Sequence, residues 1–492
     1  MDVLFTIPPQ ASEWFRRGML ESRHSGVGAP LSQAYASHFG ALRVAERDRG
    51  LTSVVKVVGV SCLLTAPWWI YYLIFCDYEA YDFLVQNALV SLRAILAIVV
   101  INLLFVRAAI RRDLKAGLPM IVGYMLKLAS SAIFLYLVLN VYEGAADMVG
   151  YFRQGAQLAS GYEATGDLPY MTPFWSSNFV KITSGYLILL FGFSVSTLMV
   201  VFATIGFWGQ YFFYRAFCIG FPEGDRFRAA VLIFLLPSIF YWTSFIGKDA
   251  LMMLGLGLVS FGFALLTRRS ALRAIPPLLV GLGITLAVRP HISALVCLAM
   301  ASTYLLGKNR RGIVGAIAKI IGIPILVAGS FYLIEQAKAF VDLQDVSQTA
   351  KVLKETAHST RLGGSQFGSN SVGVRIAYAP FLLFRPFPWE IHNLPSLVAS
   401  LEGLFLMILA WLQRRRILAV AMHFRSKPFT FFILLCIAEL SAVLAGGITN
   451  FGLLARERVM MMPMAVMLLC VPIASAQWAP APAHVYFSAP RP

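Results

Sequence analysis

The chain has 492 residues, of which 58% are hydrophobic and only 13% are charged. This apolar content exceeds that of soluble globular domains and indicates a protein that sits in lipid. The net charge of +17 does not indicate a nucleic-acid partner, because the Lys and Arg residues form short clusters between apolar runs instead of a continuous patch. We therefore expect an integral membrane protein whose partners include the lipid bilayer.

Residues 1–52 carry charged and proline residues early and contain no uninterrupted apolar core of a secretory signal. We expect them to form an uncleaved cytoplasmic arm. The segment 53–477 is then a transmembrane bundle, because an apolar helix needs roughly twenty residues to cross a bilayer core about 30 Å thick. The sequence predicts an all-α, polytopic fold of about twelve membrane-spanning helices. The expected spans are residues 53–76, 84–106, 118–141, 194–214, 229–247, 249–267, 274–290, 292–307, 312–334, 395–413, 429–447 and 459–477.

Basic residues alternate between the two sides of this expected bundle. Cytoplasmic loops are enriched in Lys and Arg, and every second connection carries a basic cluster, such as the one at 414–416. The alternation predicts that both termini are cytoplasmic, including a Pro- and Ala-rich tail at 478–492 that we expect to be disordered.

Two long connections, 142–193 and 335–394, fall on the opposite, outer side. Each contains an apolar stretch too short to span, at 185–193 and 376–384, which predicts an interfacial or re-entrant helix. Residues 361–373 are rich in Gly and Ser and are expected to form a mobile outer loop.

The six cysteines lie within or at the edges of apolar runs, without a CxxC motif or a histidine at ligand spacing. We expect them to pack in the bundle, and the sequence predicts neither a metal site nor a cofactor.

Polar residues gather where the expected spans meet the outer side. Lys248 and Asp249 form the tight turn between the fifth and sixth spans, and Arg289 and His291 flank a proline after the seventh. The structural alternative for this turn is an interfacial anchor in which the aspartate caps the helix. An arginine beside a histidine, whose imidazole can exchange protons near neutral pH, favours a functional site.

The second long connection ends in a proline- and aromatic-rich turn that holds Arg385, Glu390 and His392. A rigid polar turn suits a binding site, although an aromatic membrane belt is the structural alternative. Between the last two spans, Arg456 and Arg458 lie outside, against the bias of basic residues toward the cytoplasm. We expect an anionic group to compensate them, and the planar guanidinium suits phosphate.

The first long connection contributes Asp147 and Tyr151, which share a helical face if residues 145–155 are helical. Four further charges lie within the expected spans, where ionisable residues need a partner or water. We expect Arg93 to pair with Glu439 near the middle of the membrane. The other two buried charges are Lys127 and Glu402.

These cations, histidines and carboxylates on one face suit a lipid-linked phosphate or pyrophosphate. The cations would bind the phosphate and stabilise the leaving group, while a carboxylate or histidine would accept a proton from the attacking hydroxyl. The candidate catalytic residues are Asp147, Asp249, His291 and Glu390. The candidate phosphate- or donor-binding residues are Lys248, Arg289, Arg385, His392, Arg456 and Arg458.

The stretch Pro-Ser-Ile-Phe-Tyr-Trp-Thr-Ser-Phe-Ile-Gly-Lys-Asp at 237–249, with the long outer loops and the outer Arg and His residues, resembles bacterial cell-envelope glycan enzymes. These are the polytopic C-type glycosyltransferases and the O-antigen polymerases and ligases. The resemblance implies glycosyl transfer or polymerisation of a cell-surface polysaccharide at the outer face of the bacterial inner membrane, with a polyprenyl-linked sugar as donor and other polysaccharide-assembly proteins as partners.

The chain departs from the C-type pattern in one respect. These enzymes typically carry the catalytic aspartate in a large loop after the first span, whereas that loop is short here and Asp147, after the third span, would take this role. Polymerases and ligases instead use outer arginines with a histidine or glutamate, which Arg289, His291, Arg385 and Glu390 could supply. Two other classes stay open: a glycolipid or anion transporter or flippase using Arg93, Lys127 and Glu439, and a noncatalytic subunit of a polysaccharide export system.

Overall fold

The computed structural model describes residues 59–72, 88–268, 271–306, 324, 377–391, 394–422, 427–448 and 450–471. The chain divides into two compact units, residues 1–63 and 64–492, and every contact given below lies within the second unit. The expected arm at 1–52, the loop at 361–373 and the tail at 478–492 lie outside the described residues, as does the span at 312–334 apart from residue 324. The described residues form helices and no β-strand, which confirms the all-α class.

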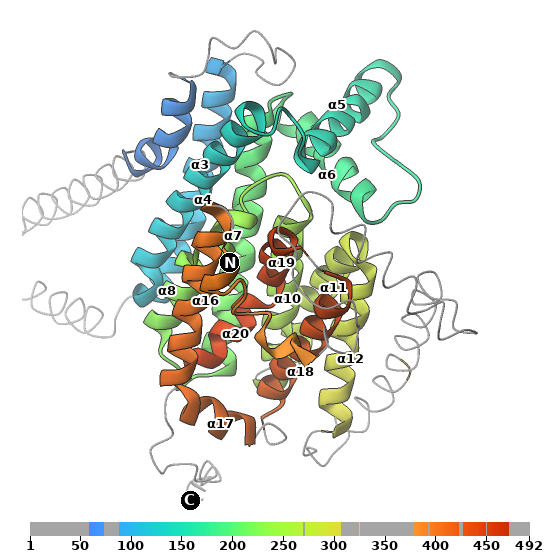
Figure 1. Cartoon of the computed structure of the whole chain (residues 1–492). Helices are drawn as coiled ribbons and strands as arrows, with labels where there is room; N and C mark the ends of the chain where they lie inside the picture. Colours follow the sequence, from blue (N-terminus) through green and yellow to red (C-terminus); the bar gives the residue numbers. More distant parts are fainter. Residues whose placement is uncertain are drawn as a thin grey trace, which may run out of the picture. The chain divides into compact units, whose positions relative to one another are not determined.

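Several helices have the length and composition to cross a membrane (Figure 1). A sixth candidate span joins α16 (Leu394–Leu412) to α17 (Arg414–Met422) across a bend of 68°. Two shorter apolar helices, α11 (Ala271–Val288) and α12 (Pro290–Leu306), occupy expected spans. The described residues thus support a membrane protein, whereas the predicted count of about twelve spans is not confirmed. The five long candidates include α3 (Ala88–Arg112), α4 (Gly117–Asn140), α7 (Val195–Gly220), α10 (Lys248–Arg268) and α18 (Pro428–Gly447).

The expected span at 229–247 is not one continuous helix. It divides into α8 (Arg226–Leu235) and α9 (Pro237–Trp242), followed by non-helical residues up to Lys248. Leu236 is extended because the residue before a proline avoids the helical conformation, so α8 ends there. Ten residues of helix rise about 15 Å, roughly half of a bilayer core.

The end of the described chain is interrupted in a similar way. The segment expected to span at 459–477 contains η6 (Arg458–Met460) and α20 (Met462–Leu469), preceded by α19 (Phe451–Glu457). These breaks matter for the site, because they place the polar residues 456–458 inside the fold instead of on a surface loop.

Close helix packing in the core depends on glycine. A Cβ atom on Gly257 of α10 would lie 2.4 Å from the carbonyl oxygen of Gly209 on α7. The two backbones therefore touch directly, as small residues allow in membrane helix pairs. This contact fixes the position of α10, whose first turn carries Lys248 and Asp249.

The first long connection forms a pair of helices, α5 (Asp147–Thr165) and α6 (Ser177–Phe191), which lie together at the upper end in Figure 1. The helix expected at 185–193 is the second half of a longer one that ends at Phe191. The conditional helix at 145–155 is confirmed from Asp147 onward, within α5. The helix predicted at 376–384 is not continuous in its described part, where Ala377 is helical and the 3-10 turn η3 (Ala379–Phe381) follows. Pro380 lacks the N–H that a longer helix would need.

Candidate functional site

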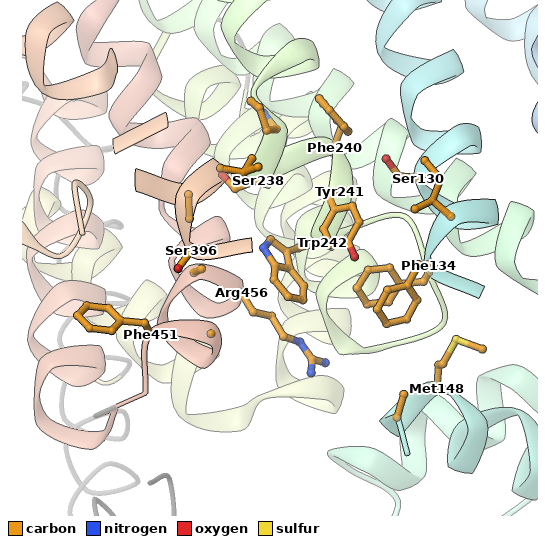
Figure 2. A pocket seen from close by; sticks show the side chains of 18 of the residues that line it. Ser130, Phe134, Met148, Ser238, Phe240, Tyr241, Trp242, Ser396, Phe451 and Arg456 are labelled. Atoms are coloured by element: carbon orange, nitrogen blue, oxygen red, sulfur yellow. The ribbon is translucent and has the colours of Figure 1, made fainter. Parts of the chain in front are cut away.

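A cavity of about 840 Å³ lies between α4, α9, α16 and α19, with residues 142–148 along one edge. Its walls are largely apolar and include several aromatic rings, as Figure 2 shows for Phe134, Tyr241, Trp242 and Phe451. The ring of Phe134 stacks on that of Phe245 with centroids 3.8 Å apart. An apolar chamber with a few polar groups is the usual form of a small-molecule or cofactor site.

Arg456 is the guanidinium that lines this cavity. In Figure 2 its side chain extends from α19 into the space between Trp242, Phe134 and Met148. Its Nε donates to Oδ2 of Asp249 at 2.5 Å, and its Nη1 donates to Oδ2 of Asp147 at 3.1 Å. Burial lowers the pKa of Arg456, but the two carboxylates outweigh burial and raise it above its usual value. The group is therefore a permanent cation.

Asp249 connects Arg456 to a second arginine. Nη2 of Arg289 lies 3.3 Å from Oδ1 of Asp249, and both Nη atoms of Arg289 donate to Glu457, with Nη2 2.7 Å from Oε1. The Asp249 side chain is only 4% exposed, whereas that of Asp147 is 63% exposed. Asp249 is thus a buried bridge between two guanidinium groups, and Asp147 is an accessible partner of one of them.

Lys248 and His291 lie beside this cluster. Nζ of Lys248 donates to Oγ of Ser176 at 3.0 Å, which ties the start of α10 to the start of α6. Partial burial, with Arg289 and Lys248 nearby, lowers the pKa of His291 to about 4. Its imidazole is therefore neutral at physiological pH, whereas the sequence had suggested proton exchange near neutral pH.

Arg458 lies in a separate, fully buried network. Its side chain is 0% exposed and donates to Oε1 of Glu402 at 3.2 Å and to backbone carbonyls, including that of Leu383 at 3.1 Å. Glu402 also accepts from the backbone N–H of Ser238 at 2.7 Å and from its hydroxyl. This network joins η6, α16 and the start of α9, so Arg458 is a structural anchor and not a free phosphate ligand.

Arg385 and Glu390 pair with each other. Nε of Arg385 lies 3.2 Å from Oε2 of Glu390, which also accepts from the backbone N–H of Phe387 at 2.8 Å. The guanidinium lies 5.3 Å from the ring centre of Phe451, a residue of the cavity wall. This pair holds the turn together beside the cavity, and His392 lies outside the described residues.

The structure thus brings most of the predicted polar residues into one region, in two groups. One group joins Asp147, Lys248, Asp249, Arg289 and Arg456, and the other holds Arg385, Glu390 and Arg458. The four arginines are compensated by the chain's own carboxylates, so the anionic groups expected beside Arg456 and Arg458 are Asp249, Asp147 and Glu402.

The four charges expected inside the membrane form no ion pair with one another among the described residues. The ion pairs among the described residues do not join Arg93 to Glu439, and Oε2 of Glu439 is buried without a described hydrogen-bond partner. Lys127 is fully buried and donates to the carbonyl oxygen of Thr243 at 2.9 Å, just after α9 ends. It therefore satisfies a buried carbonyl just beyond the end of a helix, where the helix itself supplies no partner.

Sequence reasoning missed three groups at the site. Glu457 lies between two arginines that the sequence did select, and Ser238 and Trp242 fall inside the selected stretch 237–249. Each of these residues stands in a stretch that the sequence had singled out, which was a signal for them. The sequence did not show which residues on other helices they contact. Among the described residues, no cluster of three or more His, Cys, Asp or Glu side chains is arranged to hold a metal ion.

Comparison with protein-family models, with curated proteins and with solved structures finds no match for this chain.

Proposed function

We propose that this chain is a bacterial inner-membrane glycosyltransferase or polysaccharide polymerase. It would take a sugar linked to a polyprenyl phosphate or pyrophosphate and extend a cell-surface polysaccharide at the outer face. The observation that carries the proposal is the aromatic cavity with Arg456 and Asp147 at one edge. About twelve spans with both termini in the cytoplasm belong to the same proposal.

The cavity walls suit a lipid chain. Ile133 of α4 and Val398 of α16 both line the cavity and are 55% and 47% exposed. Both helices are candidate membrane spans. A hydrocarbon chain could therefore enter from the bilayer between them, where apolar contact replaces its lipid surroundings.

The polar edge suits a phosphate. Arg456 offers a planar guanidinium that is already oriented by a buried carboxylate, and such a group binds phosphate through paired hydrogen bonds. It would stabilise the phosphate that leaves when the sugar is transferred. Asp147 is the exposed carboxylate at the same edge and would accept the proton of the attacking hydroxyl. Asp249 and Arg289 would position Arg456.

Complementation of a deletion strain tests this function. We expect Arg456→Lys and Asp147→Asn each to abolish long-chain surface polysaccharide while the membrane level of the protein stays normal. Asp167→Asn is the matched control, because Asp167 is an exposed carboxylate that contacts Thr165 and does not line the cavity. Full polysaccharide with both site variants would refute the proposal.

The same complementation assay, extended to variants of Arg93 and Glu439, separates transfer from transport. A transporter or flippase that uses charges within the helices would lose function on neutralisation of Arg93 and Glu439 and tolerate Asp147→Asn. A noncatalytic assembly subunit would tolerate all of these changes. We expect the reverse pattern, with loss confined to the residues at the cavity edge.

A further inference from the structure

The weakest part of the charge cluster is the pair between Asp147 and Arg456. Its Nη1–Oδ2 distance is 3.1 Å and the Asp147 side chain is 63% exposed, whereas the Arg456–Asp249 contact is 2.5 Å long with Asp249 only 4% exposed. Exposed ion pairs contribute little to stability, while breaking a buried pair is costly. An incoming anion would therefore displace Asp147 and leave Asp249 in place.

Arg456 keeps a further donor available. Its Nη2 makes no hydrogen bond to any of the residues that the structure describes, and the side chain lines the cavity. Once Asp147 withdraws, Nη1 and Nη2 of Arg456 can donate together to two oxygens of a phosphate in a bidentate arrangement. The positions that an anion needs are thus partly occupied by Asp147 in the free protein.

We propose, on the basis of the function proposed above, that Asp147 is an internal competitor for the phosphate site on Arg456. A phosphorylated ligand replaces the Asp147 carboxylate, and this exchange releases Asp147 beside the bound phosphate. Because residues 145–148 line the cavity directly before and at the start of α5, the exchange also loosens the edge of the cavity where α5 begins.

A binding experiment tests the exchange. Purified full-length protein in detergent is titrated with farnesyl phosphate, with inorganic phosphate and with farnesol. Removing the competing charge in Asp147→Asn is expected to tighten farnesyl phosphate binding about fivefold, the upper range for an exposed ion pair. Farnesol binding should be the same in both proteins, and Arg456→Ala should lose the phosphate-dependent part. If the lipid chain contributes to binding, inorganic phosphate binds more weakly than farnesyl phosphate. Its affinity should still rise by the same factor in Asp147→Asn.

Asp167→Asn serves as the matched control and should bind like the unchanged protein. Thermal unfolding of each variant checks that it is folded. If Arg456→Ala does not fold, it is replaced by Arg456→Lys, which keeps the positive charge and loses the planar guanidinium. Equal or weaker binding by Asp147→Asn would overturn the exchange, as would the absence of any phosphate-dependent binding.

This result is separable from the proposed function. Sugar transfer by the purified protein without the Asp147→Asn gain would contradict the exchange and leave the function standing. The predicted gain without sugar transfer would support the exchange and contradict the function.

Discussion

Asp249 holds Arg456 in place: its Oδ2 lies 2.5 Å from the arginine Nε, although 207 residues separate the two in sequence. The aspartate lies in the first turn of α10, which packs against α7 through the glycine contact, and the arginine lies in the last turn of α19. This pair connects the helix core to the cavity edge, and the other oxygen of Asp249 lies 3.3 Å from Arg289.

Asp249→Asn is expected to destabilise the protein strongly, because it leaves two partly buried guanidinium groups without their shared carboxylate. We expect the free energy of unfolding to fall by about 3 kcal/mol, measured by denaturant or thermal unfolding in detergent. Asp167→Asn should change it by less than about 0.5 kcal/mol. Equal effects of the two variants would show that the bridge carries no stability.

The buried Glu402–Arg458 pair permits a double-mutant test. Glu402→Gln alone is expected to cost about 3 kcal/mol, because Arg458 would keep its charge in a fully buried position. Changing both residues to Met should recover much of this loss, since a buried pair replaced by apolar groups is often neutral. A double mutant less stable than Glu402→Gln would instead show that the hydrogen bonds of Arg458 to the loop carbonyls dominate.

Gly257→Ala tests the helix contact beneath the site. The added methyl group would meet the carbonyl oxygen of Gly209 at 2.4 Å, so α7 and α10 must separate. We expect a loss of about 1–3 kcal/mol in stability and a weakened site. Gly283→Ala in α11 is the control, since no atom lies within 4 Å of the added methyl group. Its stability should be unchanged or slightly raised.

The sequence was sufficient for the all-helical class and for most of the long apolar helices, because length and hydrophobicity determine which segments can lie in lipid. It failed where proline divides an apolar run: Pro237 separates α8 from α9, and the run looks continuous by composition alone.

The polar residues were predictable as a set, but their pairing was not. Asp249, Arg289 and Arg456 were each selected from their local sequence, yet the sequence could not show that carboxylates of the same chain neutralise the arginines. Such pairing depends on contacts between distant helices. The cavity was unpredictable for the same reason, because its walls come from helices that are far apart in the sequence.

The pH dependence of stability tests the surroundings of His291. Its pKa is lowered to about 4 from an ordinary value of 6.5, so the unfolded chain binds a proton more readily than the folded protein between these values. Folding is therefore favoured less as pH falls from about 6.5 toward 4. His291→Gln removes this contribution, so its melting temperature should fall less than that of the unchanged protein between pH 7.5 and 5. Parallel curves would mean that His291 titrates normally.

The most direct measurement of the central claim is an experimental structure of the full chain with farnesyl phosphate bound. We expect the phosphate to lie within hydrogen-bond distance of Arg456 and the isoprenoid chain to lie along Phe134, Tyr241 and Trp242. We also expect that Asp147 no longer contacts Arg456, while Asp249 still does. A phosphate bound elsewhere, with the cavity empty and the Asp147–Arg456 pair intact, would contradict this claim.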